Sequence, residues 1–224
     1  QDDYVFGRCG EIAKKVYTPA VHPREPFETG RQLFKSPFYE REVALGGYFM
    51  EAAGWERVHG YAANEPTLLA KYRDQIPQRM NEWDSRHFWE VSNAEQLALS
   101  DDVGMVNLSH FAIYDIDGPS AEHLLEYLAV ARVGGATQVG KGVYTHFLDE
   151  KGGIRADLTI VRLSEDCFRV ICGGGTGHRD LVWIKQMAAV RNADIEVHNR
   201  THQLATLGLW GPNARKVLAS LVDD

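Results

Sequence analysis

The sequence predicts an α+β fold in which antiparallel sheets pack against helices. From residue 88 onward, segments with helical periodicity alternate with short strand segments. Three of these strand segments, at residues 142–150, 155–163 and 167–173, follow one another through short turns, which is typical of an antiparallel meander. Of the 224 residues 44% are hydrophobic and 25% are charged, so the chain can bury a sizeable globular core.

Residues 1–87 are predicted to be linking structure. The stretch TPAVHPREPFETGRQ carries three prolines and a glycine in a polar setting, which is typical of a surface loop. The next stretch, LFKSPFYEREVALGGYFMEAAGWERVHGY, is so rich in aromatic residues that it indicates core or an inter-domain face. A charged helix is predicted over residues 66–83, with a break at Pro77, because proline removes a helix donor.

Residues 88–224 are predicted to form a second unit. It starts with a short helix at residues 91–99 and continues with an apolar strand at residues 111–116. Asp117 and Gly118 end that strand as a turn.

The segment SAEHLLEYLAVARV predicts an amphipathic helix, with Ser120 as its N-cap. One apolar face is formed by Ala121, Leu124, Leu125 and Leu128. The helix prediction depends mainly on this periodicity, because the capping box is incomplete.

The meander and the segments after it follow from alternation and periodicity. In the strand at residues 155–163, Leu158 and Ile160 lie on one face and their neighbours on the other. Helical periodicity returns in GTGHRDLVWIKQMAAVRN, at Leu181, Ile184 and Met187. A last strand is predicted in DIEVHNR.

Composition argues against several classes of function. The net charge is −7 and the basic residues are scattered, so no binding to nucleic acid is expected. No apolar run is long enough for a membrane span or a secretory signal. Cys9, Cys167 and Cys172 lack CxxC spacing, which disfavours disulfides and zinc ribbons and suits a reducing compartment. No metal site is expected at His198 and His202, because zinc needs three or four converging ligands.

Two common motifs are absent from the sequence, one for nucleotide binding and one for nucleophilic catalysis. The run CGGGTGHRD is rich in glycine, but Gly173, Gly175 and His178 do not have the spacing of a dinucleotide-binding loop. We expect its glycines to let the chain turn from a strand into a helix. No GxSxG elbow occurs, so nucleophilic catalysis has no support.

Asp157 is the candidate functional acid, because it follows the Gly152-Gly153 turn at the start of an otherwise apolar strand. A partly buried carboxylate at this place is suited to accept a proton or a hydrogen bond from a cationic or N–H-bearing ligand. The alternative is a strand-edge Asp bonded to backbone N–H groups.

The same residues carry a family resemblance. The blocks VGMVNLSHFAIYDIDGPSAEHLLEYL, GKGVYTHFLDEKGGIRADLTIVRLSEDCFRV, RDLVWI and LGLWGPNARKVLASL resemble, in this order, the folate-binding aminomethyltransferases typified by the glycine-cleavage T-protein. The upstream block GRQLFKSPFYEREVALGGYFMEAAGWERV resembles the linker region of dimethylglycine and sarcosine dehydrogenases. Together the blocks favour this multidomain subgroup, in which residues 88–224 would be the N-terminal part of the folate domain.

The resemblance implies a tetrahydrofolate site with Asp157 as its functional carboxylate. In dehydrogenases of this type a flavin oxidises an N-methyl amine, and tetrahydrofolate captures the carbon as 5,10-methylenetetrahydrofolate. The motif positions imply that Phe111, Tyr144 and Ile171 line the pterin pocket; core packing is the alternative for each. Gly173 stands where T-proteins carry a folate-contacting Asn, and Asn107 where relatives commonly carry Asp.

The resemblance also implies partners outside this chain. FAD is expected in another domain of a longer polypeptide, because no flavin-binding GxGxxG occurs here and the folate domain is expected to continue past residue 224. The compartment would be the mitochondrial matrix or the bacterial cytoplasm. Two other functions stay open: a non-catalytic regulatory subunit of the pyruvate dehydrogenase phosphatase type, and a free T-protein acting on a lipoyl-bound aminomethyl group.

Overall fold

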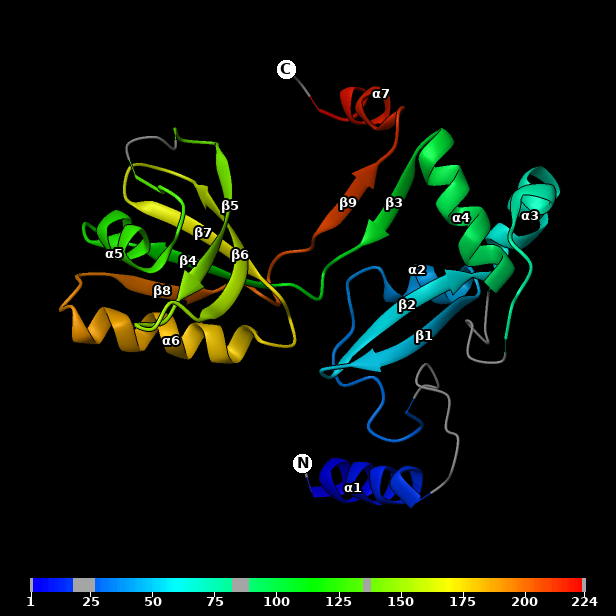
Figure 1. The fold of residues 1–224 in the computed structure, drawn as a ribbon, viewed down its shortest axis with the longest axis horizontal. Coiled ribbons are helices and arrows are strands. Elements are labelled where there is room, and N and C mark those ends of the chain that lie inside the picture. The colour runs from blue at the N-terminus through cyan, green and yellow to red at the C-terminus, as the bar shows by residue number, and fades with distance from the viewer. Residues whose placement is uncertain (1, 18–26, 82–88, 135–137, 223–224) are drawn as a thin grey trace. The chain divides into compact units, whose positions relative to one another are not determined.

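The computed structural model describes residues 2–17, 27–81, 89–134 and 138–222. The chain forms two compact units, one of Gln1–Leu108 with Leu207–Asp224 and the other of Ser109–Thr206. Figure 1 labels the elements of both units. The boundary predicted at residue 88 lies outside the described residues and stays a prediction.

The first unit combines helices with two small antiparallel sheets (Figure 1). Its elements are α1 (Asp2–Tyr17), α2 (Tyr39–Ala44), β1 (Gly47–Ala52), β2 (Trp55–Tyr61), the 3₁₀ turns Ala62–Asn64 and Arg73–Gln75, α3 (Glu65–Tyr72), α4 (Trp89–Asp101), β3 (Gly104–Asn107), β9 (Leu207–Trp210) and α7 (Ala214–Ala219). β1 pairs with β2, and β3 pairs with β9 from the far end of the chain.

Several elements of this unit were not predicted from the sequence, among them α1 and the β1–β2 hairpin. α1 buries none of its residues. The β1–β2 hairpin turns through Ala53 and Gly54, which both have positive φ. Alanine is uncommon in that conformation, so the turn carries no recognisable signal.

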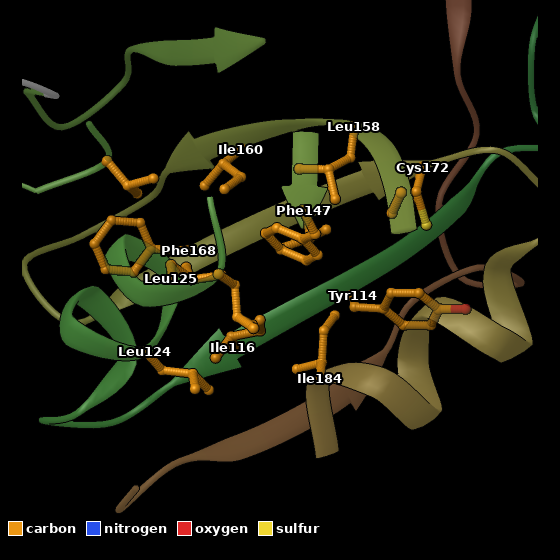
Figure 2. Packing of buried hydrophobic residues seen from close by; sticks show 14 of the residues in the cluster. Tyr114, Ile116, Leu124, Leu125, Phe147, Leu158, Ile160, Phe168, Cys172 and Ile184 are labelled. Atoms are coloured by element: carbon orange, nitrogen blue, oxygen red, sulfur yellow. The ribbon is translucent and has the colours of Figure 1, made fainter. Parts of the chain in front are cut away.

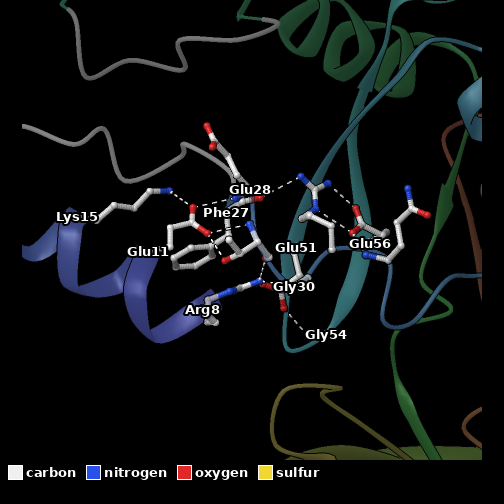
Figure 3. A network of polar contacts seen from close by, with 12 residues as sticks. Arg8, Glu11, Lys15, Phe27, Glu28, Gly30, Glu51, Gly54 and Glu56 are labelled. Atoms are coloured by element: carbon white, nitrogen blue, oxygen red, sulfur yellow. Dashed lines mark hydrogen bonds and ion pairs between the residues drawn. The ribbon is translucent and has the colours of Figure 1, made fainter. Parts of the chain in front are cut away.

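Polar contacts hold α1 in its unit (Figure 3). Arg8 forms an ion pair with Glu51 and donates to the carbonyl oxygen of Thr29 at 2.6 Å. Glu11 accepts from the N–H of Thr29 at 2.9 Å. Burial would raise the pKa of Glu11, but its hydrogen bonds outweigh that effect and lower the pKa to about 2.

The charged helix predicted over residues 66–83 is only partly confirmed. α3 covers its first half, and Leu69 and Tyr72 are buried with Val91 and Ala94 of α4. The helix ends well before Pro77, and the final residues of the prediction lie outside the described part.

The second unit is one five-stranded antiparallel sheet with two helices. Its elements are β4 (Ala112–Asp117), α5 (Ala121–Leu128), β5 (Gly142–Leu148), β6 (Ile154–Arg162), β7 (Cys167–Cys172), α6 (Gly177–Val190) and β8 (Glu196–Asn199). The strand order is β5-β6-β7-β4-β8, and every neighbouring pair is antiparallel. The predicted α+β class, the meander and both helices of this unit are confirmed, as is the short helix that α4 forms in the first unit.

Both helices pack on the same face of this sheet (Figure 2). All four residues predicted for the apolar face of α5 are buried, and α6 adds Ile184. Phe147 and Phe168 of the sheet belong to the same buried cluster and have no exposed surface. Ser120 stands at the N-cap position of α5, as predicted, but its side chain makes no capping hydrogen bond.

The glycine run after β7 turns into α6, as predicted, with the N–H of Thr176 donating to the carbonyl of Gly173 at 3.1 Å. A Cβ atom at Gly174 would lie 1.9 Å from the carbonyl oxygen of His110. A Cβ atom at Gly177 would lie 2.3 Å from the Cβ atom of Ala112. These two glycines are needed because the start of α6 approaches β4 so closely.

Two absences concern the described part of the chain only. None of its helices has the length and apolar content that crossing a membrane requires. In the same residues no three His, Cys, Asp or Glu side chains converge as metal ligands would.

Candidate functional site

The second unit carries a pocket of about 590 Å³ beside the ends of β6 and β7 and the start of α6. Its size falls within the usual range for small-molecule sites. The structure brings to this pocket all five residues predicted from the sequence, Phe111, Tyr144, Asp157, Ile171 and Gly173. A larger pocket of about 800 Å³ between α3 and α4 of the first unit contains none of them.

Tyr144, His146 and Asp157 form a cluster on two paired strands. His146 of β5 lies directly opposite Asp157 of β6 in the register, and Tyr144 precedes His146 by two positions. The three side chains therefore share one face of the sheet. The hydroxyl of Tyr144 donates to Oδ2 of Asp157 at 2.9 Å, and Nε2 of His146 lies 4.0 Å from the same oxygen.

Asp157 is more exposed than the sequence led us to expect. Its side chain is 65% accessible, so the prediction of a partly buried carboxylate was wrong. The cause is the alternation of β6, which directs Ala156 and Leu158 into the core and turns Asp157 outward. No backbone N–H in the described chain donates to Asp157, so the alternative of a structural strand-edge Asp has no support.

Tyr144 is also on the surface, with 62% of its area exposed, and it is not a core residue. Its hydrogen bond to Asp157 raises the pKa of Tyr144, because the carboxylate disfavours the phenolate form. Tyr144 therefore stays a hydrogen-bond donor to Asp157 at neutral pH.

The remaining predicted residues form the apolar part of the wall. Phe111 and Ile171 are half-buried and contribute apolar surface. A Cβ atom at Gly173 would have the hydroxyl oxygen of Thr176 as its nearest contact, at 3.6 Å, so this position has room for a side chain. Neither predicted apolar residue is part of the core cluster, which leaves them available to a ligand.

Two arginines line the pocket although the sequence analysis missed them. Arg155 is the extra residue of a β-bulge in β6, and its guanidinium lies 4.5 Å from the ring centroid of Trp183 on α6. Bulges re-aim side chains in this way. Arg179 donates to the carbonyl of Arg155 at 2.6 Å and to Asp180 at 3.0 Å. Their positive charge suits an anionic or electron-rich ligand.

Comparison with known proteins assigns this architecture to a family. The family described as "GCVT N-terminal domain" matches residues 38–224. The chain belongs to this family. The solved structure of glycine cleavage system aminomethyltransferase T from Bartonella henselae shares the fold of this GCVT domain with a TM-score of 0.64 and 24% identity, over 84% of this chain and 44% of that chain. The predicted resemblance to the aminomethyltransferase family is thereby confirmed.

A curated relative of this GCVT domain is 4-methylaminobutanoate oxidase (formaldehyde-forming) from Paenarthrobacter nicotinovorans. The two are 32% identical over 220 residues, which make up 98% of this chain and 25% of the relative. The chain thus spans about a quarter of the length of that relative. Its name describes the oxidation of an N-methylated amino acid, which is the type of chemistry that the upstream resemblance implied.

Proposed function

We propose that this chain is the tetrahydrofolate-binding, one-carbon transfer region of a flavin-linked N-demethylating amine dehydrogenase. The substrate would be an N-methylated amino acid of the dimethylglycine or sarcosine type, and the product 5,10-methylenetetrahydrofolate. FAD would lie in another domain of the same longer polypeptide, in the mitochondrial matrix or the bacterial cytoplasm. The observation that carries the proposal is the Asp157–Tyr144 pair at a pocket of a GCVT family domain.

The pocket has the chemistry that a pterin needs. Phe111 and Tyr144 offer aromatic surface, Ile171 offers apolar surface, and one carboxylate lies among them. Tyr144 engages Oδ2 of Asp157, whereas Oδ1 has no partner in the described chain. An unpaired carboxylate oxygen in an apolar wall is suited to an N–H group of a flat heterocycle.

In this proposal the side chains that line the pocket have distinct roles in one-carbon transfer. Bound tetrahydrofolate would supply the nitrogens that take up a one-carbon unit. Asp157 accepts the proton that such a nitrogen loses, or stabilises the positive charge that develops beside it. Tyr144 fixes the orientation of Asp157 through its hydrogen bond, and the apolar wall limits the access of water to the ligand.

A second candidate function is favoured by the name of the curated relative. That protein is a formaldehyde-forming oxidase, so the present chain could belong to an enzyme that releases the one-carbon unit instead of transferring it. The two functions differ in their product in the presence of tetrahydrofolate. The first gives methylenetetrahydrofolate, and the second gives free formaldehyde whether or not folate is present.

The test is an Asp157→Ala substitution in the full-length protein, assayed with an N-methyl amino acid and tetrahydrofolate. We expect amine oxidation to continue while formation of methylenetetrahydrofolate falls by about 100-fold or more, with formaldehyde released instead. Glu150→Ala is the matched control, because Glu150 is an exposed carboxylate in the same hairpin and does not line the pocket. Unchanged capture in Asp157→Ala would refute the assignment of Asp157.

A further inference from the structure

His146 lies next to the proposed carboxylate, and the proposed function gives it no task. Its Nε2 atom is 3.5 Å from the hydroxyl oxygen of Tyr144 and 4.0 Å from Oδ2 of Asp157. The rings of Tyr144 and His146 meet edge to face, with centroids 5.4 Å apart. Both β5 side chains therefore converge on the same oxygen of Asp157.

This arrangement leaves the two oxygens of Asp157 in different surroundings. Oδ2 faces a hydroxyl and an imidazole, whereas Oδ1 has no partner in the part of the chain that the structure describes. A ligand that fills the pocket would cover Oδ1 and cut it off from water. The path from Asp157 to solvent would then run through Tyr144 and His146, whose side chain is 35% exposed.

Charged groups face His146 and its pocket neighbours from two elements. Asp157 on β6 faces it, with Oδ2 at 4.0 Å from Nε2. Arg155 and Arg179 are the cations that line the pocket beside Asp157. On its own strand the neighbour is Tyr144, which keeps its proton at neutral pH because the hydrogen bond to Asp157 raises its pKa. Histidine is the side chain suited to such a step, because it changes charge between about pH 5 and 8.

We propose that His146 is a positioning residue and proton acceptor that regenerates ionised Asp157 during one-carbon transfer, with the hydroxyl of Tyr144 as the bridge. This inference rests on the proposed function. The N–H bond of the ligand breaks and its proton goes to Asp157. After the carboxyl group turns, Asp157 passes a proton to the oxygen of Tyr144, while the proton of Tyr144 moves to Nε2 of His146. The products are ionised Asp157, unchanged Tyr144 and an imidazolium, which releases its proton to water.

The test is His146→Gln in the full-length protein, with an N-methyl amino acid and tetrahydrofolate present. The measured quantity is the fraction of one-carbon units recovered as methylenetetrahydrofolate rather than formaldehyde, from about pH 5 to 8. In the wild type we expect this fraction to fall toward acid pH, because imidazolium cannot accept a proton. In His146→Gln the fraction should be lower by about tenfold at neutral pH and should lose its pH dependence.

Two controls separate this role from a merely structural one. His123→Gln makes the same substitution at an exposed histidine of α5 and should behave as the wild type. Added imidazole should restore capture in His146→Ala, which a packing defect would not allow. If His146→Gln does not fold, Tyr144→Phe removes the bridge and should abolish the same pH dependence. Retained binding of tetrahydrofolate, followed by tryptophan fluorescence, shows that a variant keeps its pocket.

The outcomes distinguish this inference from the proposed function. If Asp157→Ala loses capture while His146→Gln matches the wild type at every pH, the relay is wrong and the proposed function stands. A uniform loss in His146→Gln with unchanged pH dependence and no rescue by imidazole also overturns the relay. If capture does not depend on Asp157, both are refuted.

Discussion

The adjacent glycines 173 and 174 should respond in opposite ways to the same substitution. At Gly174 an added Cβ atom would lie 1.9 Å from the carbonyl oxygen of His110 and 3.0 Å from its carbon. Carbon and carbonyl oxygen in contact are separated by about 3.3 Å, so one backbone segment must move by more than about 1 Å. Overpacking of this kind costs about 3 kcal/mol, at the upper end of the usual range, because neither the Cβ atom nor the carbonyl group can move away unless the backbone moves.

Gly173 is the internal control for this prediction. Its added Cβ atom would meet Thr176 at 3.6 Å, an ordinary contact, and Gly173 does not have a positive φ. Alanine there should leave the free energy of unfolding unchanged or raise it by about 0.5 kcal/mol, because it restricts the unfolded chain. Urea denaturation of both variants, followed by circular dichroism, measures the difference. Equal effects of Gly173→Ala and Gly174→Ala would refute the close approach of this loop to β4.

Three further predictions follow from individual side chains. Gly173→Asn places an amide in the pocket, where relatives are expected to carry one, and should tighten tetrahydrofolate binding by about threefold to tenfold in a fluorescence titration; weaker binding would contradict the proposed pocket. Burial would raise the pKa of Asp115, but hydrogen bonds and charge from Arg169 and Arg200 outweigh that effect and lower the pKa. The ion pairs therefore stabilise the folded state above about pH 4, and this contribution is lost as the pH falls below that value. Asp115→Asn should therefore lower the free energy of unfolding by about 3 kcal/mol at neutral pH and weaken its acid dependence in urea denaturation; an unchanged acid dependence would argue against these ion pairs. Burial, reinforced by a nearby carboxylate, raises the pKa of Cys172 to about 12. Iodoacetamide should therefore alkylate the exposed Cys9 of the native protein well before Cys172, as followed by mass spectrometry. Equal rates at the two cysteines would contradict the packing of β7.

The sequence predicted the second unit well because its signals are local. The apolar faces of α5 and α6 and the alternation in β6 each lie within a few turns or one strand. β3 and β9 were missed because each is four residues long and its partner lies about a hundred positions away. No local pattern identifies such a pair.

Five residues that line the pocket were named from the sequence, whereas the exposure of Asp157 was not foreseen. The alternation that places Leu158 and Ile160 in the core also places Asp157 on the outer face, so the sequence contained the signal that corrects its predicted burial. His146 could not be assigned in the same way. Its position opposite Asp157 depends on the register of β5 and β6, and the bulge at Arg155 shifts that register by one residue.

The cluster of Tyr144, His146 and Asp157 comes from a single hairpin at the edge of its sheet. Among the strands of the described residues β5 pairs with β6 alone, besides an isolated bridge to Ala129, so side chains on its outer face can change without disturbing the pairing of β7, β4 and β8. A short contiguous stretch of the sequence therefore contains the groups of the proposed site, while the rest of the unit supports them. Substitutions in that stretch would change the proposed site while the scaffold stays unaltered.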